Sequence, residues 1–503
     1  MTNTTTQVST SFTNLLARFG GEHKAYQLNG VQWCVDLERR GGGGGGGGGL
    51  LADEMGLGKT LTMLGTMVCN FKQHTLLVLP MALIEQWRAE ILRITGHRAL
   101  VYHGSVAKRN VGIAELMSAP VVIVTYHCVG KYEGENKSLI HAVEWDRVVF
   151  DEAHHLRNGW KTAAGRGANA LRSKMKWLVT GTPMQNGGDD LRRLGWVMGL
   201  PSNVNFVEWL SVRMLRRTKR DVGLDVSLAT LSENHEEVEW NRKEEDLAGQ
   251  IHAAIPRVGR EDRLRLYTAA RKSCILSSML STNLAAIAEC VVSAATTTTP
   301  SSDTVDTTDT TDTTYIETTN KTVEDFERRV AAVLASDVSG RSKVERVVNA
   351  VLSNAGNGAG KLVFCHFIDE INILVELLSA SGLRVAAVDG RVTGSKRAAI
   401  LAGKYDALVL QIQTGCEGLN LQRDFSEVYF VSPHWNPAVE DQAVGRCYRL
   451  GQTKAVNVFR FAMTAFGAVA GGTLDAYVNQ IQNRKRAECG DVMANLVDVC
   501  IDN

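Results

Sequence analysis

A glycine-rich stretch ending in Gly58, Lys59 and Thr60 has the residue types of a phosphate-binding loop. Glycines let backbone N–H groups close on phosphate oxygens, the lysine reaches the β- and γ-phosphates, and the threonine hydroxyl holds Mg²⁺. The apolar residues 61–68 predict a helix whose positive N-terminal end faces the phosphates. The strict pattern places glycine six residues before the lysine, whereas this chain has Asp53 there. Alone, this loop is a weak signal, so a nucleotide site requires a second motif.

Two adjacent carboxylates, Asp151 and Glu152, supply that second motif. They follow the apolar run 145–150, which predicts a strand. In metal-assisted hydrolysis of a phosphoanhydride, Asp151 is expected to hold Mg²⁺ through water, and Glu152 to orient and deprotonate the attacking water. An isolated Asp-Glu pair is equally well explained as a solvated strand end. Together with the phosphate loop, the pair favours ATP hydrolysis.

Three more segments have residue types suited to phosphate contacts. Residues 180–186 combine small hydroxyl residues with glycine, and residues 413–421 form a glycine-rich turn after a predicted strand. Arg446 and Arg449 are three residues apart, which places them on one face of a helix. Guanidinium groups neutralise the charge of a transferring phosphoryl group. Taken singly, each segment is as typical of an ordinary turn or of solvated arginines.

The composition limits the class of protein. The chain has 503 residues, of which 44% are hydrophobic, enough for two or three domains with buried cores. Its formal net charge is +1, so contacts with nucleic acid must come from local basic patches. The ten cysteines form no CxxC pair, which argues against zinc fingers and predicts reduced thiols. The polar N-terminus is no signal peptide, and no apolar run approaches the ~18 residues of a membrane span.

Near-continuous apolar strands alternate with helical segments in two parts of the chain, which indicates parallel sheets covered on both faces. The predicted fold class is therefore α/β, with two lobes separated by a helical insert and a disordered linker. The glycine run 41–49 is expected to be a flexible insertion, because consecutive glycines have no side chains to pack. The predicted segments are a flexible tail (1–22), lobe one (23–240), a helical insert (241–295), a Thr/Asp-rich linker (296–320), lobe two (321–470) and a closing helix (471–503).

Six motifs of the chain resemble, in type and in order, those of the SWI/SNF-like DNA-dependent ATPases of helicase superfamily 2. The motif set is of the DEAH-box type. The resemblance covers roughly residues 24–240 and 340–465, and Asp53 is this family's own form of the phosphate loop. The motifs are DEMGLGKT (53–60), DEAH (151–154), TGTPMQN (180–186), MLRRTKRDV (214–222), TGCEGLNL (414–421) and HWNPAVEDQAVGRCYRLGQT (434–453).

The resemblance implies two RecA-like lobes that share a site for ATP and Mg²⁺. Gln27 stands where the family reads the adenine. Thr60 and Asp151 would bind the metal, and the catalytic residues would be Lys59, Asp151, Glu152, Arg446 and Arg449. The implied nucleotide-binding residues are Gln27, Asp53, Glu54, Met55, Gly56, Leu57, Gly58, Lys59, Thr60, Gly418 and Gln442.

Contacts to a DNA backbone are also implied by the resemblance. The basic run 216–220 is expected either to face DNA or to stabilise the lobe surface. The other expected contacts are residues 79–87 and 125–126 in lobe one, and 364–367, 414–415 and 435–436 in lobe two.

The function implied by the resemblance is ATP-dependent translocation along double-stranded DNA, with remodelling of nucleosomes or other protein–DNA complexes. The expected location is the nucleus or the DNA-containing compartment of a virus-infected cell, without secretion or a membrane partner. Two alternatives stay open: a strand-separating DNA helicase and a non-catalytic DNA-binding scaffold with a degenerate motor. The presence of all five catalytic candidates argues against the scaffold. The helicase is harder to separate, because a strand-separating wedge is not a short motif.

Overall fold

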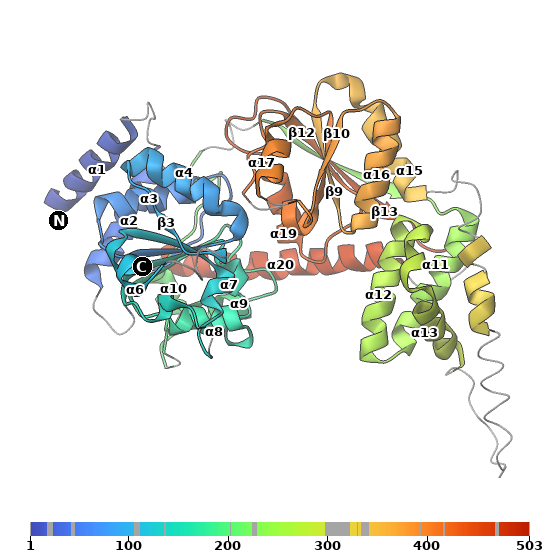
Figure 1. Cartoon of the computed structure of the whole chain (residues 1–503), viewed down its shortest axis with the longest axis horizontal. Coiled ribbons are helices and arrows are strands. Elements are labelled where there is room, and N and C mark those ends of the chain that lie inside the picture. The colour runs from blue at the N-terminus through green and yellow to red at the C-terminus, as the bar shows by residue number, and fades with distance from the viewer. Residues whose placement is uncertain are drawn as a thin grey trace, which may run out of the picture. The chain divides into compact units, whose positions relative to one another are not determined.

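A computed structural model shows two compact units, each organised around a parallel β-sheet (Figure 1). Unit 1 comprises residues 1–228, 436–438 and 484–503, and unit 2 comprises residues 229–435 and 439–483. The two parallel sheets confirm the predicted α/β class. No helix in the described part of the chain is long and apolar enough to cross a membrane. The structure describes residues 2–17, 24–41, 46–104, 111–134, 137–201, 203–223, 229–296, 322–328, 330–332, 342–392, 394–415, 418–467 and 472–501.

The sheet of unit 1 has the strand order β3-β4-β2-β5-β6-β1-β7. Successive residues of one strand enter different cores: Leu76 and Val78 lie in one hydrophobic cluster, Leu77 and Leu79 in the other. Both faces of the sheet are therefore covered, which explains why its strands are mostly apolar. The strands are β1 (Leu50–Leu51), β2 (Thr75–Leu79), β3 (Leu100–Val101), β4 (Val121–Thr125), β5 (Trp145–Asp151), β6 (Ser173–Val179) and β7 (Met214–Leu215). The helices are α1 (Thr2–Ala17), α2 (Ala25–Arg40), α3 (Lys59–Cys69), α4 (Ile84–Thr95), α6 (Ile113–Ser118), α7 (Tyr126–Val129), α8 (Ala163–Ala170), α9 (Asp189–Val197) and α10 (Phe206–Arg213).

The prediction of a flexible N-terminal tail over residues 1–22 is wrong, because α1 is a helix with a buried face. Val8, Phe12, Leu15 and Leu16 recur at helical spacing and are all buried in the core that α2 and α3 share. Threonine-rich sequence has low helix propensity, and tertiary packing of the apolar face overrides it.

The glycine run is not simply a flexible insertion, because its end is part of the sheet. Gly47 donates to the carbonyl of Lys174 at 2.9 Å, and Gly47 and Gly49 accept from the N–H groups of Lys176 and Leu178 at 3.0 and 2.9 Å. A Cβ on Gly48 would lie 2.0 Å from the carbonyl oxygen of Lys176. Close backbone approach therefore requires glycine here, and ladder hydrogen bonds replace the missing side-chain packing. Residues 42–45 lie outside the described residues.

The sheet of unit 2 has the order β10-β11-β9-β12-β13-β8, again with every pair parallel. The strands are β8 (Leu231–Val238), β9 (Gly360–Cys365), β10 (Val385–Val388), β11 (Ala407–Gln411), β12 (Phe425–Phe430) and β13 (Val456–Met463). The helices of this unit are α11 (Arg242–Ala254), α12 (Arg260–Ile275), α13 (Leu284–Thr296), α15 (Ser342–Ser353), α16 (Ile368–Ala380), α17 (Gly394–Ala402), α18 (Ile412–Gly415) and most of α19 (Pro437–Val444). Helix α20 (Leu474–Ile501) belongs to unit 2 up to residue 483 and to unit 1 from residue 484. Helix α20 is the predicted closing helix.

The predicted end of lobe one at residue 240 is wrong, because β8 belongs to unit 2 as an edge strand paired with β13. Its sequence, LSENHEEV, is mostly exposed and polar, so it lacks the apolar pattern of the other strands. The predicted insert, 241–295, forms α11, α12 and α13, which lie side by side (Figure 1). Their apolar residues join one cluster with the sheet of unit 2. The predicted linker lies outside the described residues after Thr296.

Candidate active site

The phosphate loop of unit 1 connects β1 to the N-terminus of α3, which begins at Lys59. Gly56 and Gly58 have φ values of 93° and 80°, in the left-handed region that glycine adopts without strain. A Cβ on Gly58 would lie 2.9 Å from Nε2 of Gln27, so the Gln27 side chain lies beside the loop. These positions favour glycine over residues with a side chain, and they lie directly before a helix N-terminus. Such a loop suits a phosphate group.

Lys59 extends into the loop, where its Nζ donates to the carbonyls of Asp53 and Glu54 at 2.8 and 3.3 Å. Burial lowers the pKa of Lys59, while the nearby charges of Glu152 and Asp151 raise it. The structure therefore brings the predicted phosphate-binding lysine and the predicted acid pair into one electrostatic environment.

The loop 180–186 lies against the phosphate loop. A Cβ on Gly181 would lie 2.6 Å from Cγ of Met55 and 3.1 Å from Nζ of Lys59. The backbone N–H groups of Gln185 and Asn186 both donate to one carboxylate oxygen of Asp190, at 2.9 Å each. These two hydrogen bonds fix the end of the loop. Because Gly181 lies beside Nζ of Lys59, a group bound at Lys59 would also lie near Gly181.

Asp151 ends β5 and is buried. Its Oδ2 accepts from the indole N–H of Trp87 at 2.8 Å, and its Oδ1 accepts from the backbone N–H of Glu152 at 2.9 Å. Burial, reinforced by the charge of Glu152, raises the pKa of Asp151 to about 7. The hydroxyl of Tyr126 donates to the backbone carbonyl of Asp151 at 2.6 Å. Trp87 and Tyr126, which were predicted to contact DNA, thus both donate hydrogen bonds to Asp151.

Glu152 is the single non-glycine residue with positive φ in the described part of the chain, at 50°. Its Oε2 lies 3.2 Å from Nδ1 of His154. A residue held in this sparsely populated region costs about 1–3 kcal/mol, and such strain clusters at functional sites. The backbone conformation of Glu152, directly after β5, therefore sets the direction of its side chain.

Asp53, the departure from the strict loop pattern, is only 1% exposed and pairs with Arg217. Arg217 Nε and Nη2 donate to the two Asp53 oxygens at 3.0 and 2.5 Å, and its Nη1 donates to the carbonyl of Tyr26 at 2.5 Å. The Asp53 carboxylate therefore has a structural partner where a contact with nucleotide was predicted.

The rest of the basic run contacts the same loop. Lys219 Nζ lies 3.1 Å from a Glu54 oxygen, and Arg216 donates to the carbonyl of Ala52 at 2.9 Å. We expected this run to face DNA or to stabilise the lobe surface; three of its four basic side chains instead brace the phosphate loop, and Arg220 is exposed. The sequence held no signal for these pairs, which join residues more than 160 positions apart.

Arg446 and Arg449 do not share a helix face, because α19 ends at Val444 and both lie in the turns after Gly445. They nevertheless converge: Arg446 Nη1 donates to the carbonyl of Leu419 at 3.5 Å, and Arg449 Nη1 donates to the side chain of Asn420. The Nε of Arg446 is buried without a hydrogen-bond partner among the described residues.

Two further residues of unit 2 were predicted to contact the nucleotide, Gly418 and Gln442. Gly418 has a φ of 71° and begins the turn that carries Leu419 and Asn420. Gln442 is buried on α19. Burial lowers the pKa of Arg449, as does the charge of Arg446. The two arginines thus contact the residues that directly follow Gly418, and Gln442 lies on the helix that precedes them.

Among the DNA contacts predicted in unit 2, the prediction for Phe364 is wrong. Its side chain is 1% exposed and stacks on Phe430 in the core. His366, Phe367 and Trp435 follow β9 and β12, at the carboxyl ends of neighbouring parallel strands. Side chains at such ends meet at one edge of a sheet, where α/β proteins place their ligands.

Two family models match the chain. The SNF2-related domain matches residues 26–200, and the helicase conserved C-terminal domain matches residues 342–451. No DEAH-box family model is among these matches, so the DEAH-box assignment is not supported, although the residues Asp-Glu-Ala-His are present.

Curated relatives are similar across most of the chain. DNA excision repair protein ERCC-6-like of Danio rerio is 26% identical over 86% of this chain and 34% of its own length. ATP-dependent DNA helicase DDM1 of Arabidopsis thaliana is 25% identical over 88% and 59%. Chromodomain-helicase-DNA-binding protein 1 of Gallus gallus is 26% identical over 87% and 25%. The chain therefore spans less than two thirds of these relatives. A solved Sulfolobus solfataricus SWI2/SNF2 ATPase core in complex with dsDNA, 20% identical, covers 88% of each chain with a TM-score of 0.38.

Proposed function

Because the chain carries an SNF2-related domain and a helicase C-terminal domain and is homologous to the SWI2/SNF2 ATPases of superfamily 2, we propose that it is a DNA-dependent ATPase that translocates along double-stranded DNA and remodels protein–DNA complexes. The observation that carries the proposal is the position of Lys59, inside a glycine cradle and within the electrostatic influence of Asp151 and Glu152. A helix N-terminus, a buried lysine and a carboxylate pair are what hydrolysis of a phosphoanhydride requires.

In this mechanism each part of unit 1 has a defined task. The N–H groups at the start of α3 and the Lys59 ammonium bind the phosphates of ATP, and Gln27 lies beside the loop to contact the base. Mg²⁺, held by Thr60 and Asp151, would neutralise phosphate charge. Glu152 orients the attacking water and accepts its proton.

Arg446 and Arg449 of unit 2 would neutralise the charge that develops on the transferred phosphoryl group. An arginine suits this task because its fork of donors is planar and always charged. ATP binding would then favour closure of the two units, and hydrolysis their separation, so that alternate grips on the DNA phosphates produce stepping. Phosphate contacts fix position without reading bases, so no sequence preference is expected.

The names of the relatives include DNA repair, DNA binding and chromatin remodelling. They favour DNA and DNA-bound proteins, including nucleosomes, as partners, and the nucleus as the location. None of the named relatives favours a virus-infected cell.

The test is the ATPase rate of the purified chain without nucleic acid and with single-stranded DNA, double-stranded DNA, RNA or nucleosomes, with Glu152→Gln as the inactive control. We expect double-stranded DNA to stimulate most, and stimulation to weaken steeply with salt. Equal rates with and without DNA would favour the scaffold alternative. ATP-dependent separation of a forked duplex would favour the helicase.

A further inference from the structure

The helical insert of unit 2 buries an arginine beside a segment predicted to contact DNA. Arg271, near the C-terminal end of α12, is 7% exposed. Its Nη1 lies 3.2 Å from Nδ1 of His366, its Nη2 donates to the carbonyl of Pro433 at 3.2 Å, and its guanidinium carbon lies 5.2 Å from the ring centre of Trp435. One side chain of the insert thus touches the ends of both central strands, β9 and β12.

Arg271 has an unusual environment for a buried cation. No ion pair involving it is found within the described ranges of the chain, and burial lowers its pKa. Removing an arginine from water without a carboxylate in direct contact is costly, so the charge must be balanced by other groups. A carbonyl, an imidazole nitrogen and the face of an indole contact the guanidinium, and the more distant charges of Asp475, Glu370 and Glu440 raise its pKa.

The contact also fixes the state of His366. A guanidinium group only donates hydrogen bonds, so Nδ1 of His366 must be the acceptor, and the ring is neutral. Its Nε2 then carries the proton and donates to the carbonyl of Ser432 at 3.2 Å. Burial, Arg271 and His434 all lower the pKa of His366 well below its ordinary value. The His366 ring stacks on the ring of His434, with 5.6 Å between the ring centres. The orientation of His366 therefore constrains His434, which directly precedes Trp435 in the chain.

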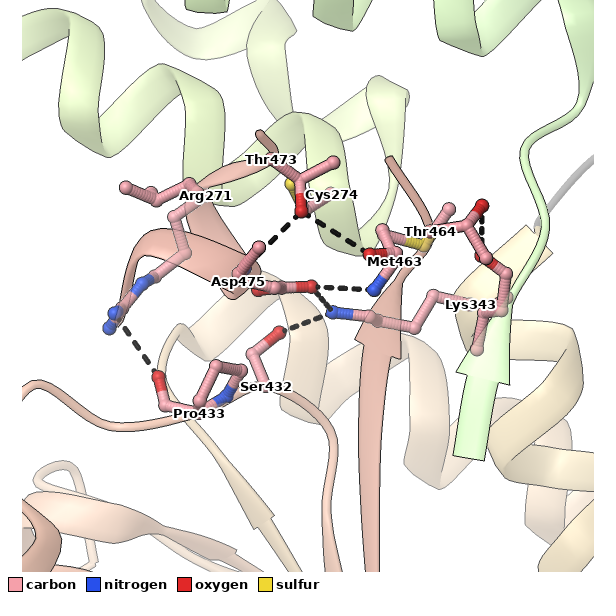
Figure 2. A network of polar contacts seen from close by, with 12 residues as sticks. Arg271, Cys274, Lys343, Ser432, Pro433, Met463, Thr464, Thr473 and Asp475 are labelled. Carbon is pink, nitrogen blue, oxygen red and sulfur yellow. Dashed lines mark hydrogen bonds and ion pairs between the residues drawn. The ribbon is translucent and has the colours of Figure 1, made fainter. Parts of the chain in front are cut away.

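The segment 432–435, which carries Trp435, is also contacted by a buried lysine (Figure 2). Lys343 of α15 donates to the hydroxyl of Ser432 at 3.0 Å and pairs with Asp475 at the start of α20. Asp475 in turn accepts from the backbone N–H of Met463 at 3.0 Å. Residues 432–435 are therefore held between Arg271 on α12 and Lys343 on α15.

Two tyrosines complete the enclosure of Trp435. Tyr267, one turn before Arg271 on α12, meets the indole edge to face at 5.8 Å, and Tyr477 of α20 does so at 6.1 Å. Aromatic pairs in this geometry contribute about 0.5–1.5 kcal/mol beyond burial. The half-buried Trp435 is thus oriented mainly by residues outside its own motif.

We propose that Arg271 is a positioning residue through which the helical insert sets the geometry of His366 and Trp435, and thereby the affinity of unit 2 for the DNA backbone. The proposal rests on the proposed DNA-dependent function. It assigns the insert a role in coupling DNA to ATP hydrolysis without placing Arg271 itself on DNA.

The test compares Arg271→Ala with Arg260→Ala, which removes the same charge from an exposed position on the same helix. For Arg271→Ala, the double-stranded DNA concentration that gives half-maximal ATPase should rise about tenfold, the order expected for losing a hydrogen bond to a charged group. The rate without DNA and the maximal rate with DNA should stay within about twofold, as should all three values for Arg260→Ala. Arg271→Lys, which keeps the charge but not the fork, should be intermediate.

A double-variant cycle separates positioning from general weakening. If Arg271 acts through Trp435, then Arg271→Ala should add little to the defect of Trp435→Ala, whereas additive defects contradict the proposal. If Arg271→Ala does not fold, Arg271→Lys carries the same comparison, and an unchanged DNA dependence overturns the inference. A wild-type chain without any DNA stimulation overturns the proposed function as well. A stimulated wild type with unaffected Arg271 variants overturns only this inference.

Discussion

Asp53 and Arg217 form a buried ion pair that joins the phosphate loop to the segment after β7. The backbone repeats the connection, since Ala52 donates to Leu215 at 2.7 Å and Glu54 to Arg217 at 2.8 Å. Breaking a buried pair by removing one partner leaves an uncompensated charge and costs about 3–5 kcal/mol. The pair therefore holds the loop in shape before any nucleotide binds.

We expect Arg217→Ala to raise the KM for ATP by about tenfold or more, because the unpaired Asp53 carboxylate disturbs the loop backbone. Arg220→Ala, which removes an exposed charge from the same run, is the matched control and should change KM little. Steady-state ATPase kinetics measures both. A KM unchanged in Arg217→Ala would show that the loop keeps its shape without the pair.

Glu370 of α16 is a second buried carboxylate. One of its oxygens accepts from the N–H groups of His366 and Phe367 at 2.8 and 3.1 Å, and the other has no partner within the described residues. Burial is the larger effect and raises the pKa of Glu370 to about 7. Because the folded state binds this proton more tightly, its stabilising contribution is complete below pH ~4.3 and is lost as the pH rises through about 7.

Relative to Glu370→Gln, the wild-type free energy of unfolding should therefore fall between pH ~4.3 and pH ~7, by at most about 4 kcal/mol. Urea denaturation of both proteins at several pH values measures the difference, and Glu376→Gln, an exposed carboxylate on the same helix, is the control. A constant difference across this range would contradict the assignment.

At the scale of elements, the glycine run shows how a segment without side chains becomes part of a sheet. Gly48 has a φ of 106°, and a Cβ there would collide with the backbone of β6. We expect Gly48→Ala to destabilise the fold by more than about 2 kcal/mol, because both the conformation and the space exclude a side chain. Gly112→Ala, where a Cβ meets open space at negative φ, is the control in thermal denaturation. Equal melting temperatures would mean that the segment is not bound to β6.

At the scale of the whole molecule, the proposed mechanism requires residues of both units. Arg446→Ala/Arg449→Ala should leave ATP binding largely intact, since Lys59, Thr60 and Gln27 lie in unit 1. Single-turnover hydrolysis on DNA should fall by about 10³ or more, the order associated with an arginine finger. Arg423→Ala, an exposed arginine of unit 2, is the control. Hydrolysis at the wild-type rate in the double variant would sink the idea of a site shared by the two units.

The sequence by itself determined the class of fold and predicted the residues of the candidate site. Strands buried on both faces are mostly apolar, as β2 and β4 are, so the alternation of strands and helices could be predicted. The candidate phosphate loop and acid pair could be predicted because each is a local pattern: glycines before Lys59, and Asp151 at a strand end.

Only the tertiary structure decided what lies far apart in the chain or depends on packing. No local pattern connects Asp53 to Arg217, or Arg271 to Trp435, because each pair forms only when separate elements come together. The helix α1 and the polar edge strand β8 were missed for the same reason. Each is stabilised by the neighbour that it packs against or pairs with, and not by its own propensity.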